Sequence, residues 1–165
     1  MFEGFKGSSK WLLTQSPLSK VLDLSYTNIT SFPDSMWQLK QLDFLGLNRT
    51  NISNLPIEVC NLSRLQFLHI RHCRQLKSLP CTIGELKNIK HLDLNDCDSL
   101  AGIPRGISQL TSLNKLGFFL LMVKAMLGVE EGESGMCSLK DFINFPNLME
   151  LCISVKVGKT VDGKK

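Results

Sequence analysis

The sequence lacks the features that mark several common classes of protein. Its 165 residues contain no run of five or six like charges, so the net charge of +4 is dispersed along the chain. A clustered basic stretch is the usual signal for binding to nucleic acid or to a membrane surface, and these functions have little support. A long apolar run is also lacking, because the most apolar one, residues 116–129, is 14 residues long and contains Lys124. A membrane-spanning helix needs about 20 such residues.

The beginning of the chain and its cysteines narrow the class further. The opening sequence MFEGFKGSSKWLL lacks the sustained apolar core of a signal peptide, so we expect a cytoplasmic protein. The six cysteines do not show the paired spacing of a disulfide framework or of a zinc site. An apolar content of 43% over this length is typical of one globular domain with a core of its own.

What the sequence does contain is a repeat. Leucines that alternate with polar residues recur every 23 or 24 residues, at Leu22, Leu45, Leu68, Leu92 and Leu116. Prolines keep the same spacing, at Pro33, Pro56, Pro80 and Pro104. A period of about 20 to 29 residues with the pattern L-x-x-L-x-L is typical of a leucine-rich-repeat solenoid. The predicted fold class is therefore α/β, a right-handed solenoid with a parallel sheet on the concave face and short helical turns and loops on the convex face.

Each repeat is expected to contain one short strand and one proline-led turn. The alternation of apolar and polar residues predicts strands over residues 21–24, 44–47, 67–70 and 91–94. Proline cannot donate to a sheet, so each proline should open the convex side. Three residues after each strand's last inward residue stands a small side chain: Thr27, Thr50, Cys73 or Cys97. We expect it to point inward and to bond the backbone of the next coil.

The repeat organises most of the chain. Residues 1–17 form an N-terminal remnant or cap, and residues 18–127 form the regular repeats, about 4.5 copies. The segment 119–123 is solidly apolar, which predicts a strand covered on both faces. Residues 128–147 form an irregular loop and a short helix that begins at Ser138 and ends before Pro146. Residues 148–155 restore the strand pattern 35 residues after the previous strand, and residues 156–165 form a basic, frayed tail.

Outward strand positions should line up in columns on the concave face. One column holds Val21, Phe44, Phe67, His91 and Lys115, and the next holds Asp23, Gly46, His69, Asp93 and Gly117. A third column holds Ser25, Asn48, Arg71, Asn95 and Phe119, and a fourth holds Tyr26, Arg49, His72, Asp96 and Leu120. Aromatic and Arg residues are the usual anchors of protein interfaces. The predicted partner-binding residues are Phe44, Arg49, Phe67, His69, Arg71, His72, His91 and Asp93. Alternatively, Phe44 and Phe67 merely stack on each other across neighbouring strands.

The same face offers a weaker case for metal or catalytic chemistry. All three histidines fall near Asp93 and Asp96, and neighbouring strands lie about 4.8 Å apart, within reach of a shared metal ion. Side chains on one strand face diverge, however, and a zinc site needs three or four convergent ligands, so a solvated polar patch is favoured. The inward cysteines are unsuited to nucleophilic catalysis. We expect no enzyme activity, no catalytic residue, no metal and no cofactor.

Nucleotide binding by this chain is rejected. The nearest match to a P-loop is the segment Gly158-Lys159-Thr160, but the motif needs a glycine where Ile153 stands. A helix must also follow the motif, to present its N-terminus to the phosphates.

Three phrases carry a resemblance to a known family. LPCTIGELKNIKHLDLNDC, IPRGISQLTSL and LGFFLLMV resemble the leucine-rich-repeat region of plant nucleotide-binding disease-resistance proteins, the coiled-coil class especially. The resemblance covers residues 16–155 and implies an intracellular immune receptor in plant defense, whose repeats recognise pathogen effectors and hold the nucleotide-binding module inactive. It implies as partners a pathogen effector or a guarded host protein, and the nucleotide-binding domain of the parent receptor. A full receptor also carries signalling and nucleotide-binding domains, so we expect a fragment or a truncated relative.

Two other functions stay open. The first is a freestanding intracellular scaffold of the Ras-group type, although its regular 23-residue period fits the 35-residue step poorly. The second is an extracellular repeat receptor or inhibitor, in which the sequons at Asn28, Asn48, Asn51 and Asn61 would be glycosylated. Extracellular plant repeats carry Gly before Ile-Pro in their convex half, and the pairs Leu55-Pro56 and Leu79-Pro80 lack that glycine.

Overall fold

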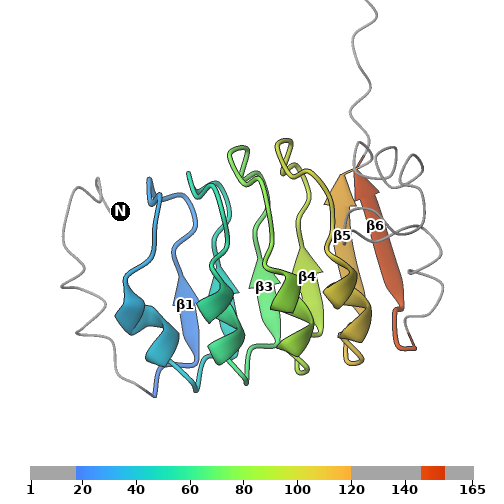
Figure 1. Cartoon of the computed structure of the whole chain (residues 1–165), viewed down its shortest axis with the longest axis horizontal. Helices are drawn as coiled ribbons and strands as arrows, with labels where there is room; N and C mark the ends of the chain where they lie inside the picture. The colour runs from blue at the N-terminus through green and yellow to red at the C-terminus, as the bar shows by residue number, and fades with distance from the viewer. Residues whose placement is uncertain (1–17, 120–145, 155–165) are drawn as a thin grey trace, which may run out of the picture.

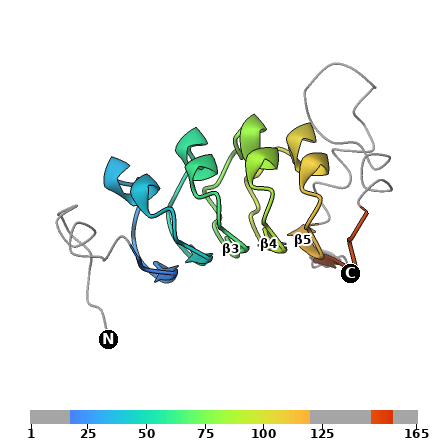
Figure 2. The ribbon, with the colours of Figure 1, turned by 90° about the horizontal axis from the view of Figure 1, so that it is seen from below.

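The computed structural model describes residues 18–119 and 146–154, which form a curved solenoid (Figure 1). Six parallel strands lie side by side in chain order. They are β1 Val21–Asp23, β2 Phe44–Gly46, β3 Phe67–His69, β4 His91–Asp93, β5 Lys115–Phe119 and β6 Glu150–Ser154. Figure 2 shows the sheet on the inner side of the arc and the helical turns on the outer side. The predicted solenoid, with its sheet and convex turns, is confirmed.

The strands pair in the predicted register. Leu45 pairs with Leu22 and Leu68, and the pairing continues through Leu92 and Leu116. The 35-residue step also holds, because Leu116 pairs with Leu151 of β6. Strands β1–β4 each end one residue earlier than predicted. The next residue still donates its amide to the neighbouring coil, as Leu24 does to the carbonyl of Gly46 at 2.8 Å, so the ladder continues past the strand.

The convex side consists of single 3-10 turns. They are η2 Asp34–Gln38, η3 Ile57–Asn61, η4 Cys81–Glu85 and η5 Arg105–Gln109. A proline stands immediately before each, with φ between −65° and −74°, the value that its ring imposes. The proline carbonyl accepts the amide three residues on, as Pro80 does from Ile83 at 3.0 Å. Proline thus starts the convex turn and stays outside the sheet, as predicted.

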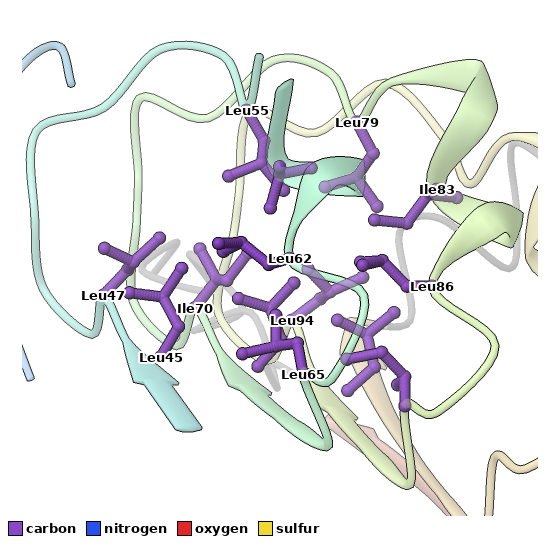
Figure 3. Packing of buried hydrophobic residues seen from close by; sticks show 14 of the residues in the cluster. Leu45, Leu47, Leu55, Leu62, Leu65, Ile70, Leu79, Ile83, Leu86 and Leu94 are labelled. Carbon is purple, nitrogen blue, oxygen red and sulfur yellow. The ribbon is translucent and has the colours of Figure 1, made fainter. Parts of the chain in front are cut away.

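Between the sheet and the turns lies a continuous apolar core. Strand residues such as Leu45 and Ile70 and convex residues such as Leu62 and Ile83 point into the same space (Figure 3). The predicted inward residues are all at most 5% exposed: Leu22, Leu24, Leu45, Leu47, Leu68, Ile70, Leu92 and Leu94. Each coil buries its leucines against the next coil, which is how a solenoid is stabilised.

The small inward side chains bond differently from the prediction. Cys73 and Cys97 are buried as expected, but their thiols donate to the preceding coil, to the carbonyls of Leu47 (3.0 Å) and Ile70 (2.8 Å). The Thr50 hydroxyl instead donates to the carbonyl of Leu47 in its own coil at 2.9 Å. The prediction that these side chains bond the backbone of the next coil was therefore wrong. The inward slot of each thiol lies against the carbonyls of the preceding coil, so the thiols donate there and not to the next coil.

Several predictions fall outside the described residues. These concern the N-terminal segment 1–17, the continuation of the apolar strand beyond residue 119, the loop and helix before residue 146, and the tail from residue 155. They stay predictions. In the parts of the chain that the structure describes, no helix has the length and apolar character needed to cross a membrane.

Candidate protein-binding face

The eight predicted site residues come together on the concave face. Phe44, Phe67 and His91 are direct partners across strands β2, β3 and β4. His69 and Asp93 pair beside them, in the next column. Arg49, Arg71 and His72 lie in the turns that leave β2 and β3. The parallel register thus gathers residues that are up to 49 positions apart in the sequence into one surface.

The aromatic part of this surface is built from phenylalanine–histidine pairs. The Phe44 ring lies 5.1 Å from that of His69 at an angle of 79°, and the Phe67 ring lies 4.9 Å from that of His91 at 73°. Both are edge-to-face contacts, and all four rings are half-buried. Each phenylalanine thus packs on a histidine of the following strand, a contact that sequence analysis did not identify.

Burial lowers the pKa of His69 below its usual 6.5, and the nearby carboxylate of Asp93 opposes this shift only in part. His69 is therefore uncharged at neutral pH. An uncharged imidazole against Phe44 gives this part of the face an apolar and aromatic character, with hydrogen-bonding nitrogens at its surface.

A charged part adjoins the aromatic part. The Arg71 guanidinium lies 3.7 Å from a carboxylate oxygen of Asp93 and 4.0 Å from one of Asp96. The ring of His72 lies 3.3 Å from the same Asp96 oxygen. Such half-exposed ion pairs each stabilise a fold by about 0–1 kcal/mol, so their main effect is to orient the side chains. Arg71 and His72 of one repeat thus lie against Asp93 and Asp96 of the next repeat.

The turns after the strands have an unusual backbone. Tyr26, Arg49, His72 and Asp96 all adopt the left-handed conformation, with φ between 56° and 63°. They occupy one slot, immediately before the inward Thr or Cys. This conformation is uncommon for residues other than glycine, and here it recurs because cross-coil bonds hold it, such as the one from the Arg49 amide to the Arg71 carbonyl at 2.8 Å. Sequence analysis placed these residues in one column but missed their backbone geometry.

Three outward positions of the prediction, Gly46, Gly117 and Asn95, are in fact covered. Gly46 faces the concave side, but a side chain there would meet the carboxylate of Asp23 and the ring of Phe44. Asn95 was expected in an outward column and is only 6% exposed, because its amide donates to the Asp93 carboxylate at 2.8 Å. These three predictions of exposure were wrong, because side chains of the same face cover the three positions.

The described thiols differ in their exposure to solvent. Burial raises the pKa of the Cys97 thiol to about 12. Cys81, directly after the proline that precedes η4, is exposed. In residues 18–119 and 146–154, no three His, Cys, Asp or Glu side chains are arranged to hold a metal ion.

Comparison with known proteins agrees with this architecture. A family model described as a leucine-rich repeat region matches residues 6–162. The chain belongs to the leucine-rich repeat family. Domains of this family generally act as protein-interaction modules. No curated protein matches the sequence.

Solved leucine-rich repeat structures from plants and bacteria resemble the chain. The plant peptide hormone receptor RGFR1, in complex with RGF2, has a TM-score of 0.61 and 26% identity over 80% of this chain and 20% of its own. The Arabidopsis receptor kinase HAESA, in complex with the peptide hormone IDA and the co-receptor SERK1, has a TM-score of 0.50 and 23% identity over 62% and 18%. An internalin from Listeria monocytogenes has a TM-score of 0.52 and 15% identity, over 80% of this chain and 40% of its own. The chain thus spans two fifths or less of each of these proteins.

Proposed function

We propose that the concave face over β2, β3 and β4 is the protein-binding surface of an intracellular plant immune receptor. The observation that carries this proposal is the half-exposed group of Phe44, Phe67 and Arg71, with aromatic contacts and ion pairs that fix the side chains before a partner arrives. Ordered aromatic and Arg anchors bind at a low cost in side-chain entropy. The resemblance to disease-resistance proteins supports the cytoplasmic location and the role in defense.

The size of the face indicates how such a surface would be used. Six strands about 4.8 Å apart, each about 10–17 Å long, give a face of roughly 250–400 Å2. A standard interface buries about 800 Å2 on each partner. Within one receptor chain, however, a short connection supplies an effective concentration of order mM. We therefore propose two partners: the nucleotide-binding domain of the parent receptor, held in the resting state, and a pathogen effector or guarded host protein that competes for the face.

The test uses a receptor that contains this segment, expressed in leaf tissue with and without the effector. Arg71→Gln removes the cation without adding a third carboxylate beside Asp93 and Asp96, so the fold should survive. A Phe44→Ala/Phe67→Ala variant removes the aromatic anchors. We expect each variant either to cause cell death without effector or to lose the response to it. Arg105→Gln, in η5 on the convex side, is the matched control, and circular dichroism checks folding.

If the two concave-face variants and Arg105→Gln all signal like the parent, the concave face is not the recognition surface. If Arg105→Gln alone changes signalling, the convex side is.

A second candidate function is a cell-surface receptor for a peptide or protein, and the likeness to RGFR1 favours it. A glycine before Ile-Pro, which is typical of extracellular plant repeats, distinguishes intracellular from extracellular repeats less well than expected. The repeat that contains β4 has Gly102 directly before Ile103-Pro104. The sequons distinguish the candidates. Asn61 is exposed, whereas the Asn48 side chain accepts the Arg71 amide at 2.8 Å. A deglycosylation shift of the natural protein that disappears in Asn61→Gln would establish the cell-surface function, and an unshifted band supports the intracellular one.

A further inference from the structure

A basic cleft lies beside the concave face, where strands β2 and β3 end. It has a volume of about 400 Å3, within the range of ligand pockets. Its lining comes from the turns of two successive coils: Arg49, Thr50, Asn51, His72, Arg74 and Gln75. All six carry polar side chains. The lining therefore offers hydrogen-bonding groups to a charged or polar ligand.

The two guanidinium groups of the cleft, those of Arg49 and Arg74, differ in their surroundings from Arg64 and Arg71. Elsewhere on the solenoid arginines are paired, as Arg64 is with Asp43 at 3.6 Å and Arg71 is with Asp93. Within residues 18–119 and 146–154, neither Arg49 nor Arg74 forms an ion pair with a carboxylate. Arg49 instead lies over the ring of Tyr26, 5.7 Å from its centre. This cation–π contact orients the guanidinium and leaves its charge uncompensated.

The rest of the cleft is arranged in support. The carboxylate of Asp96 lies 3.3 Å from the Nδ1 atom of His72 and fixes that ring. Arg49 and His72 both stand on left-handed turns that cross-coil hydrogen bonds hold in place. One coil further on, Asp98 takes the slot of Arg74, so the basic character is confined to coils two and three. The Arg49 guanidinium and the His72 ring are therefore positioned before any ligand binds.

We propose that this basic cleft binds an anionic group, a carboxylate or a phosphate, presented by a partner protein. The planar donor fork of Arg matches the oxygens of both groups, and two such forks from adjacent coils can bind one anion together. Asn51 and Gln75 supply further neutral donors. Only the source of the anion rests on the proposed function, since the cleft would bind a small anion without any partner.

The test titrates the full chain, labelled with 15N, with sodium phosphate and separately with sodium acetate. Sodium chloride keeps the ionic strength constant, because screening alone moves the signals of exposed charges. We expect saturable shifts of the Arg49 and Arg74 side-chain signals and of the Asn51 and Gln75 amides. A stronger response to phosphate indicates a phosphorylated partner, and a stronger response to acetate indicates an acidic side chain or chain end.

A double variant, Arg49→Gln/Arg74→Gln, should weaken this binding by about tenfold or more, because it removes both charge-assisted donors. The control, Lys87→Gln/Arg105→Gln, removes the same charge from the convex side and should bind like the parent. The absence of saturable shifts, or an equal loss in both double variants, would overturn the proposal. Saturable binding together with unchanged signalling of the concave-face variants would leave the cleft established and refute the concave face as the recognition surface.

Discussion

The register of the solenoid predicts a large difference between two neighbouring residues, Leu68 and His69. Leu68 is fully buried and lies between Leu45 and Leu92 in the core. Leu68→Ala removes most of a buried side chain and leaves a cavity that adjacent coils can fill only in part. The expected loss of unfolding free energy is about 2–5 kcal/mol, the range for such truncations in cores.

His69→Ala acts on the opposite face of the same strand. A solvent-exposed residue would cost less than about 0.5 kcal/mol. His69, however, is half-buried and makes an edge-to-face contact with Phe44 at 5.1 Å. Such a contact contributes about 0.5–1.5 kcal/mol, so the cost should be intermediate between those of a surface and a core residue.

The assay is urea unfolding at pH 7.5, followed by circular dichroism, with the midpoint and slope fitted for each variant. Leu68→Ala should lower the midpoint well below that of His69→Ala at an unchanged slope. Equal destabilisation by the two substitutions would refute the register, because a strand in this sheet buries only one of its faces. A changed slope in Leu68→Ala would instead show that the coils no longer unfold together.

Three further predictions follow from the site and the core. The pKa of His69 in the folded protein is below 6.5, so its contribution to stability is fully present above pH 6.5 and is lost as the pH falls toward the folded pKa. Between pH 7.5 and pH 5.5 the parent should therefore lose more unfolding free energy than His69→Gln, as measured by urea unfolding. Cys81 should react with a thiol reagent before Cys97, because burial and a raised pKa protect the Cys97 thiol until urea is added. Equally fast labelling of both thiols would contradict the inward orientation of Cys97. Arg49→Val should cost about 1 kcal/mol more than Arg49→Ala in urea unfolding, since a β-branched residue fits φ 56° poorly, and equal costs would mean that the turn relaxes.

The spacing of leucines and prolines by itself determined the solenoid, its register and its buried face. This is because strand side chains alternate with a period of two, so the position of one leucine in each coil fixes which residues face inward. Proline, which cannot donate a hydrogen bond, likewise had to stand outside the sheet. The inward placement of Cys73 and Cys97 followed from the same register, and the structure confirms it.

Only the tertiary structure decided how the outward side chains combine. Phe44 contacts His69, and Arg71 lies between two acids of the next coil. Such choices depend on side-chain rotamers and on distances between residues more than twenty positions apart, which a repeat pattern leaves free. The left-handed turn at Arg49 carries no glycine to signal it, because bonds from the neighbouring coil hold the backbone there. The basic cleft was likewise not predicted, because its lining comes from two coils that lie together only in the folded solenoid.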